Sequence, residues 1–394
     1  MVDYNPFSHE LQMDPWDTYR RLREEAPVYH NPEIGFWALS RFDDVLAASL
    51  DPQTFMSSHG VTIEGLGGDF DMLIAKDPPE HTWHRKLISR VFSAKNVANL
   101  EPFIRKVAGE LLDAARDRGE LDVVADFSAR LPMEIVSELL GIPSELRDEI
   151  HELTDAFLSQ DEGDGTANIP EASIAATQRL FEILGGLTQS LRERPNDGIF
   201  SMLVHTPVVD EEGNETFLTN EQLSFRFIEL SIAGHETVMK LIASGVVLLW
   251  WYPQARRELA QDPELLPNAV EEMVRLCPPS HYQGRWTSRD VELHGVTIPK
   301  DQRVILLTAA ASRDPREFEN PDVVDIRRTI SRQIGFGFGA HLCIGAPLAR
   351  LETRIAFEEL LSRFPEYEVE ESGIVRGFGS NVHGLKHLPI RLNV

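Results

Sequence analysis

The chain has 394 residues, of which 42% are hydrophobic, so it is long enough to bury a large core. Its 63 acidic residues against 38 basic ones give a formal charge of −25, and such a field repels phosphate backbones and anionic lipid surfaces. We therefore expect no nucleic-acid partner. Two cysteines, Cys277 and Cys343, are too few for a disulfide framework and favour a reducing compartment, so the cytoplasm is the expected location.

Neither the start of the chain nor its most apolar segment predicts a membrane protein. The first residues lack a basic patch followed by an apolar run, so we expect no export peptide. The longest apolar run, Leu241 to Tyr252, is shorter than the roughly 20 residues that a membrane-spanning helix needs. We expect no membrane anchor.

Hydrophobic residues recur at helical spacing along most of the chain. The predicted helices are 19–25, 81–92, 97–118, 123–140, 172–193, 221–252 and 348–364. The strand-like segments are 35–40, the hairpin 291–298, 303–308 and 388–392. The segment 159–170, rich in Asp and Gly, is typical of a loop between two helices. These patterns predict a mainly α fold with a small β region, organised as a single domain over 1–394 with β subregions near 28–60, 280–310 and 375–394.

Polar residues interrupt the middle of the longest predicted helix. The segment Ala233-Gly234-His235-Glu236-Thr237 places a glycine, an acid and a hydroxyl where a structural helix would carry Leu or Ala. Gly234 costs about 1 kcal/mol of helix propensity relative to Ala. Space beside a bound ligand would justify that cost, but a kink with a satisfied polar cluster is an equal alternative. Zinc is excluded because Met239 stands where a second histidine would be needed.

A single cysteine lies in a glycine-rich stretch directly before a helix. The stretch runs from Phe336 to Gly345 and is followed by Ala346-Pro347-Leu348, with the proline in the first helical turn. Free backbone N–H groups and the helix dipole at that point favour the thiolate form of Cys343. A thiolate is the ligand that donates electron density to haem iron and promotes O–O cleavage. Considered by itself, a lone cysteine is more often a buried, inert side chain, and that interpretation would prevail without the other motifs.

Two pairs of charged residues at helical spacing are weaker signals. Glu272 and Arg275 are three residues apart on a short helix, and their hydrophobic neighbours indicate a partly buried ion pair. His81 and Arg85 are four residues apart and are suitably spaced to hold an anionic group together.

Taken together, these motifs closely resemble those of the cytochromes P-450, of the soluble bacterial type, along essentially the whole chain. The cysteine stretch matches the family pattern at Phe336, Gly339, Cys343 and Gly345. The other two motifs match as well and follow in the family's order; they are carried by Ala233, Gly234, Glu236, Thr237, Glu272 and Arg275. The resemblance implies the cytochrome P-450 fold, in which a haem is sandwiched between the long central helix and the cysteine-bearing loop and helix.

The same resemblance implies a role for each residue around a b-type haem (heme b, iron protoporphyrin IX). Cys343 would be the axial iron ligand, and His81, Arg85, Arg285 and His341 would hold the two propionates. Gly234, beside Ala233, would leave room for dioxygen, and Thr237 and Glu236 would deliver protons. Glu272 and Arg275 would form a structural ion pair.

The chain departs from the family at one position. Members often complete the Glu–Arg pair with an arginine in a P-x-R-F segment, where this chain has Val323. Arg327 and Arg328 are the candidate substitutes, and the sequence does not choose between them.

Three functions are compatible with these residues. The first is a monooxygenase that inserts an oxygen atom from molecular oxygen into a C–H bond of a hydrophobic small molecule; the others are a haem-binding sensor or store, and a helical protein without cofactor. Thr237 with Glu236 favours the first, and also disfavours a peroxide-driven relative, because only oxygen activation needs proton delivery. The chain ends about 50 residues after Cys343 without a flavin or iron–sulfur segment. A ferredoxin and its reductase are the implied electron donors.

The resemblance places the substrate pocket among five segments. They are 59–73, 157–169, the helix near Leu230 and Ala233, 280–283, and 379–383. The first is apolar through Ile63, Leu66, Phe70, Met72 and Leu73, which favours a lipid-like, terpenoid, steroid or aromatic substrate. His281, Tyr282 and Gln283 are compatible with gripping one polar group of the substrate, and equally with hydrogen bonding inside the β region.

Basic residues on two helices form the expected docking patch for the electron donor. His84, Arg85, Lys86 and Arg90 belong to one, and Arg350 and Arg354 follow Cys343 on the other. Of these, Lys86 and Arg350 are expected to set the association rate.

Overall fold

A computed structural model describes residues 2–64, 71–116, 118–158, 171–196, 198–209 and 212–392. Helices make up most of it. They are α1 (His9–Met13), α2 (Trp16–Glu25), α3 (Phe42–Leu50), α4 (Glu80–Ile88), α5 (Ala94–Asn99), α6 (Glu101–Arg116), α7 (Arg130–Leu140), α8 (Ser144–Leu158), α9 (Glu171–Glu193), α10 (Ile199–His205), α11 (Asn220–Trp251), α12 (Pro253–Gln261), α13 (Leu266–Leu276), α14 (Thr308–Ala311) and α15 (Ala346–Arg363). The predicted loop 159–170 lies outside the described residues.

The strands form one five-stranded sheet and several small ones. The large sheet has the order β1 (Val28–Asn31), β2 (Phe36–Leu39), β10 (Arg303–Leu306), β7 (Gln283–Thr287) and β3 (Phe55–Met56), with β10 parallel to β2. The small sheets are β11 (Tyr367–Val369), β14 (Pro389–Leu392) and β4 (Glu120–Asp122); β12 (Val375–Gly377) with β13 (Gly384–His387); β5 (Val208–Val209) with β6 (Glu215–Thr216); and β8 (Val291–Leu293) with β9 (Val296–Ile298).

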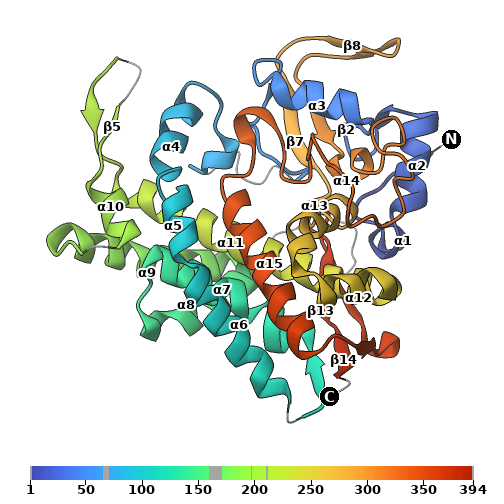
Figure 1. Ribbon diagram of the computed structural model, residues 1–394. Helices are drawn as coiled ribbons and strands as arrows, with labels where there is room; N and C mark the ends of the chain where they lie inside the picture. The colour runs from blue at the N-terminus through green and yellow to red at the C-terminus, as the bar shows by residue number, and fades with distance from the viewer. Residues whose placement is uncertain are drawn as a thin grey trace.

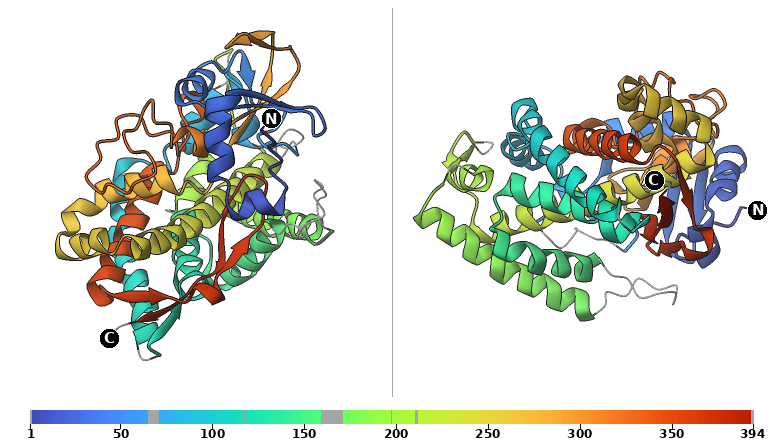
Figure 2. Two further views of the ribbon diagram at one scale, coloured as in Figure 1. Left: turned by 90° about the vertical axis from the view of Figure 1, so that its right-hand side faces the viewer. Right: turned by 60° about the horizontal axis from the view of Figure 1, so that its bottom comes forward.

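The large sheet and the helices α8, α9 and α10 occupy different ends of the molecule (Figure 1). In Figure 1 the large sheet lies with α1, α2 and α3 on the right, and α8, α9 and α10 lie on the left. The right-hand view of Figure 2 keeps the same separation between the blue N-terminal helices and the green ones. The mainly α fold with a small β region is therefore confirmed.

Helix α11 is the central element of the α-rich part. A capping box starts it, in which the side chains of Thr219 and Gln222 each accept from the other residue's backbone N–H. Trp251 ends it just before Tyr252 and Pro253, as the proline predicted. The helix is long and apolar enough to cross a membrane, but 56% of its most apolar window is buried inside the protein. It packs against α7, α9, α13 and α15, as a core helix does.

Two predicted helices are divided in the structure. The predicted helix 97–118 separates into α5 and α6, because Pro102 in the first turn of α6 has no N–H with which to continue the preceding helix. The predicted helix 123–140 begins as a π-helical turn, Val123–Ser128, before α7. Asp122 starts that turn by accepting from the N–H groups of Val124 at 2.9 Å and Ala125 at 3.2 Å.

One glycine allows the segment around Val61 to lie directly on the large sheet. The Gly284 N–H on β7 donates to the Val61 carbonyl at 2.7 Å. A Cβ at Gly284 would lie 2.6 Å from the Val61 carbonyl carbon, which is a backbone atom and has little freedom to move. This contact fixes the chain next to Thr62 and Ile63 against the sheet.

We predict that Gly284→Ala lowers the free energy of unfolding by about 1–3 kcal/mol, the range for overpacking a close contact. Denaturant unfolding of both proteins measures the difference. The matched control is Gly186→Ala on α9, where an added Cβ meets nothing within 4 Å. That control should be neutral or stabilising by up to about 1 kcal/mol, because Ala has the higher helix propensity. Equal effects of the two substitutions would contradict the argument.

Candidate haem site

The Cys343 loop is closed by its own backbone. The Cys343 N–H donates to the Phe336 carbonyl at 2.8 Å, and Gly337, with a φ of 72°, turns the chain between them. Gly339 has a φ of 69°, and a Cβ there would lie 2.4 Å from the Ser49 carbonyl oxygen at the end of α3. Both glycines are therefore needed for the shape of this loop.

Helix α15 begins three residues after the cysteine, with Pro347 in its first turn, as predicted. Burial raises the pKa of the Cys343 thiol, while the N–H groups of Gly345 and Ala346 and the charge of Arg85 act in the opposite direction. The expectation that the helix start favours the thiolate stays a prediction: the N–H donors support the charged form, and the protein atoms crowded around the sulfur oppose it. Coordination to a metal deprotonates a thiol outright, so iron would supply what the loop lacks.

The side chain of Cys343 and the middle of α11 are accessible although they lie on elements of the core. Although protein atoms crowd around its sulfur, Cys343 keeps an exposed surface. Ala233 is exposed as well, halfway along a helix that other helices surround. Helices α11 and α15 are in contact further along, where a Cβ on Gly245 would meet the ring of Phe357. The exposed Cys343 and Ala233 therefore belong to two elements that pack together, which fits a cofactor bound by both.

Four predicted propionate partners gather near the loop. The rings of His81 and His341 are 4.2 Å apart between centroids. The charges of Arg85 and Arg285 act on both histidines, whose pKa values fall, mainly through burial, to about 4 for His81 and about 2 for His341. His81 is buried and its Nε2 has no hydrogen-bond partner. Buried donors of this kind call for an acceptor.

The protein supplies little negative charge to this cluster. Asp77 is the acid that acts on His81 and Arg285, and its two oxygens already accept from the N–H groups of Ser57 at 2.7 Å and Ser58 at 3.1 Å. Burial lowers the pKa of Arg285 to about 10. Two carboxylates of a bound porphyrin match this excess of donors, so the residues fit the haem.

Three of the four also have protein partners, and one of them is Arg285, which donates to the neighbouring Gly284 carbonyl at 2.6 Å. The other two have partners that the sequence did not indicate. The guanidinium of Arg85 donates to the Leu342 carbonyl, next to the cysteine. His341 Nε2 lies 3.2 Å from the Ser57 hydroxyl. No pattern in the sequence connects Ser57 to this loop, because 284 positions separate the two residues.

The motif on α11 is held by specific contacts. The Thr237 hydroxyl donates to the Ala233 carbonyl at 2.7 Å, and the Glu236 carboxylate pairs with the ammonium of Lys240. A Cβ on Gly234 would lie 2.7 Å from Cγ2 of Val136 on α7. Close packing of α7 therefore accounts for the glycine, and room for dioxygen at Gly234 stays a prediction.

The predicted ion pair is fully buried. Arg275 donates to Glu272 through Nε at 2.7 Å and through one terminal nitrogen at 2.8 Å, and both side chains are at most 1% exposed. Arg275 also donates to the carbonyls of Ser312 at 3.0 Å and Pro321 at 2.6 Å. It therefore ties α13 to the irregular chain that leads to the cysteine loop.

Arg328 takes the place of the arginine that Val323 replaces. Its Nε donates to Glu272 at 3.2 Å, and its side chain is 12% exposed. Arg327 points elsewhere and pairs with Glu258 on α12. The structure thus chooses between the two candidates that the sequence left open.

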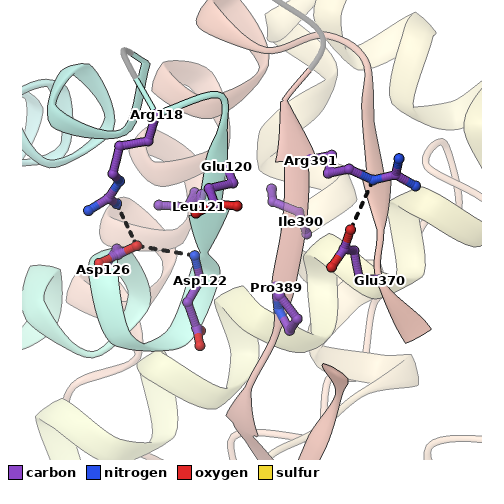
Figure 3. A pocket seen from close by; sticks show the side chains of 9 residues that line it. All are labelled: Arg118, Glu120, Leu121, Asp122, Asp126, Glu370, Pro389, Ile390 and Arg391. Carbon is purple, nitrogen blue, oxygen red and sulfur yellow. Dashed lines mark hydrogen bonds and ion pairs between the residues drawn. The ribbon is translucent and has the colours of Figure 1, made fainter. Parts of the chain in front are cut away.

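A separate concavity of about 290 Å³ lies at the sheet formed by β4, β11 and β14 (Figure 3). Its charged lining is already paired, Arg118 with Asp126 at 2.6 Å and Arg391 with Glu370 at 3.0 Å. None of the motif residues lines it, so it is not the candidate site.

Known proteins share this architecture. The cytochrome P450 family model matches residues 144–378. Putative cytochrome P450 123 of Mycobacterium tuberculosis is 36% identical, covering 98% of this chain and 96% of its own. Vitamin D(3) 25-hydroxylase of Pseudonocardia autotrophica is 35% identical, covering 98% and 96%. The structure of the polyketide synthase cytochrome P450 PksS of Bacillus subtilis superposes with a TM-score of 0.89 at 31% identity, with both chains fully covered.

The chain belongs to the cytochrome P450 family. It is therefore a haem-dependent monooxygenase, and it uses dioxygen, redox partners and a hydrophobic substrate. The resemblance drawn from the motifs, the fold it implied and the haem cofactor are confirmed. The individual site residues stay predictions that the contacts above support.

We predict that Arg328→Gln destabilises this P450 by about 1–3 kcal/mol, because a buried acceptor of Glu272 loses a charged donor. Arg327→Gln is the matched control, since its ion pair is exposed and such pairs contribute about 0–1 kcal/mol. Denaturant unfolding, followed together with the haem absorbance, measures both. A smaller effect for Arg328 than for Arg327 would remove Arg328 from the buried network.

Proposed function

We propose that this P450 hydroxylates a C–H bond of an apolar small molecule, with electrons delivered by a separate ferredoxin and its reductase. The observation that carries the proposal is the pair Glu236 and Thr237 at the midpoint of α11, partly accessible and close in sequence to the exposed Ala233. When bound, haem supplies the chemistry that activates dioxygen. A sensor, a store or a peroxide-driven enzyme has no need of a proton route, which favours hydroxylation over these alternatives.

Thr237 and Glu236 have separate tasks in this proposal. The hydroxyl of Thr237 donates to a carbonyl of its own helix, which leaves its oxygen lone pairs free to accept a hydrogen bond. By rotating away from that carbonyl, the same hydroxyl can donate to a molecule bound beside Ala233, where the helix is accessible. Glu236 is partly buried beside it and can take up and release a proton.

An apolar substrate with few polar contacts fits the described residues. The side chains of 280–283 make hydrogen bonds within the protein, as one of the two interpretations expected. His281 Nδ1 lies 2.9 Å from the Tyr19 hydroxyl, and the Tyr282 hydroxyl lies 3.1 Å from that of Ser380. Gln283 donates to Ser280 at 2.9 Å. These side chains therefore do not offer a grip for a substrate group.

The apolar lining is narrower than the sequence predicted. Ile63 and Leu73 are buried in core clusters, so they do not extend an accessible lining, and Leu66 and Phe70 lie outside the described residues. Met72 and Leu230 stay partly accessible. The predicted pocket segment 157–169 lies almost wholly outside the described residues. The name of the vitamin D(3) hydroxylase relative supports a steroid-like molecule within the lipid, terpenoid, steroid and aromatic classes.

The surface proposed for the ferredoxin is also smaller than the sequence suggested. Lys86 and Arg90 are exposed on and after α4. His84 is fully buried, and burial lowers its pKa to about 4, so it adds no charge at neutral pH. Arg350 pairs with Glu271 and stacks over Phe336, which weakens the expectation that it steers docking. Arg354 pairs with Glu358 at 2.6 Å. We place docking near Lys86, in the cytoplasm.

Thiolate ligation predicts a specific spectrum. The reduced carbonyl complex of the wild-type protein should show the red-shifted Soret band of a haem-thiolate, because a thiolate donates electron density to the iron. Cys343→His should lose that band, and Cys277→Ser, which changes the other cysteine, should keep it. Absorption spectroscopy of the three purified proteins is the measurement. Loss of the band in Cys277→Ser would reverse the ligand assignment.

Proton delivery predicts a change in the use of electrons. Thr237→Ala should bind haem and substrate normally, while the amount of product per electron pair falls by about tenfold or more. Thr177→Ala on α9 is the control, because Thr177 makes the same bond to its own helix, at 2.7 Å to Ser173, away from the motif. The amount of oxidised substrate and the number of electron pairs consumed are measured in the same reaction. An unchanged ratio in Thr237→Ala would favour a structural role and a sensor or peroxide-driven function.

A further inference from the structure

The acid of the α11 motif has a buried basic partner one helical turn away. Lys240 is 8% exposed, and its ammonium pairs with Glu236. A buried lysine without a partner would carry a large desolvation penalty, so this position depends on an acid within reach. Held from one side in this way, the Glu236 carboxylate loses rotamers that a free glutamate would sample.

The carbon chain of Lys240 is enclosed by the β12–β13 hairpin. A Cβ on Gly384, the first residue of β13, would lie 2.3 Å from Cγ of Lys240 and 2.7 Å from its Cβ and Cδ. The hairpin therefore rests directly on this side chain and leaves it no room to swing toward β13. Gly384 is paired across the hairpin with Gly377.

The charge of Lys240 also reaches the turn before the hairpin. Burial lowers the pKa of His383 to about 4, and the positive charge of Lys240 acts in the same direction. The His383 ring stacks on that of His281 at 3.7 Å between centroids, with 3° between the planes. The backbone N–H of His383 donates to the Pro279 carbonyl at 2.9 Å, so the turn is fixed to the chain before β7.

We propose that Lys240 is a positioning residue that links the seating of the β12–β13 hairpin to the orientation of the Glu236 carboxylate. The turn 379–383, expected to border the substrate, is thereby connected to the acid of the proton route through one side chain. The proposal rests on the proposed function for its consequence in turnover. The link itself is a property of the folded protein and is measurable without turnover.

The first experiment measures amide hydrogen exchange of the holoenzyme. Lys240→Met should raise the exchange rate of the backbone in 379–387 by about tenfold, since the hairpin loses the paired side chain on which it rests. Glu236→Gln should produce part of the same increase, and Lys240→Arg should restore protection. Unchanged exchange in Lys240→Met would overturn the link, whatever the enzyme's reaction proves to be.

The second experiment measures product per electron pair in single and double variants. Lys240→Met should lower this ratio about tenfold in the wild-type background and cause no further loss in the Glu236→Gln background, because residues that act as a unit are not additive. The same loss in both backgrounds would show that Lys240 acts elsewhere and would overturn the proposal.

Substitutions at two glycines of the hairpin test the link between the β12–β13 hairpin and Lys240. Gly384→Ala should also lower the ratio, because its new methyl group displaces Lys240. Gly377→Ala is the matched control, where an added Cβ meets its nearest atom at an ordinary 3.7 Å. Equal ratios for the two variants would contradict the proposal.

Discussion

The hydrogen bond from the Cys343 N–H to the Phe336 carbonyl organises the haem side of this molecule. It closes a loop that holds the thiol in front of the first turn of α15. The N–H groups of that turn have no carbonyl partner within the helix. The loop is seated on α3 through Gly339, so its position depends on an element almost 300 residues earlier. The backbone N–H groups of Gly345 and Ala346 act on the thiol, so the path of the chain orients this ligand.

Charge balance explains much of the remaining arrangement. The pKa of the Cys343 thiol is raised by burial, and the nearby cluster of His81, His341, Arg85 and Arg285 has too few acids of its own. The thiol of Cys343 fits a metal cation that binds sulfur, and the cluster of four basic side chains fits anionic groups. A metalloporphyrin with two carboxylates answers both demands at once. Binding of the cofactor and stability of the fold are linked for this reason.

The sequence predicted the long helices better than it predicted the β structure. Long amphipathic helices have a clear period, so α9, α11 and α15 were predicted to within a few residues, with Pro253 and Pro347 marking their ends. Strands β1, β3, β7, β12 and β13 lie in the predicted β subregions but were not assigned one by one, and β4, β5, β6 and β11 were missed, because two or three residues carry no readable alternation. Helices α3 and α8 were missed too, and no predicted helix overlaps either of them.

The unpredicted features of the site are contacts between distant segments. The choice of Arg328 over Arg327 depends on how the chain after α14 folds back on α13, and Ser57 meets His341 only through the tertiary structure. Lys240 is different. Its spacing of four residues from Glu236 is visible in the sequence and typical of a helical ion pair, so this partner was open to prediction from the motif alone.

The contact between Gly234 and Val136 has a consequence for protein engineering. Position 234 lies at the seam with α7 and is also the position predicted to leave room for dioxygen. Any side chain introduced there competes for space with Val136 before it can change the shape of the predicted ligand site. Libraries that vary position 234 by itself will therefore return misfolded proteins along with altered specificities, and the two effects will be confounded. Randomising positions 234 and 136 together, with Ala included at the latter, separates the fit between the helices from the fit of the substrate.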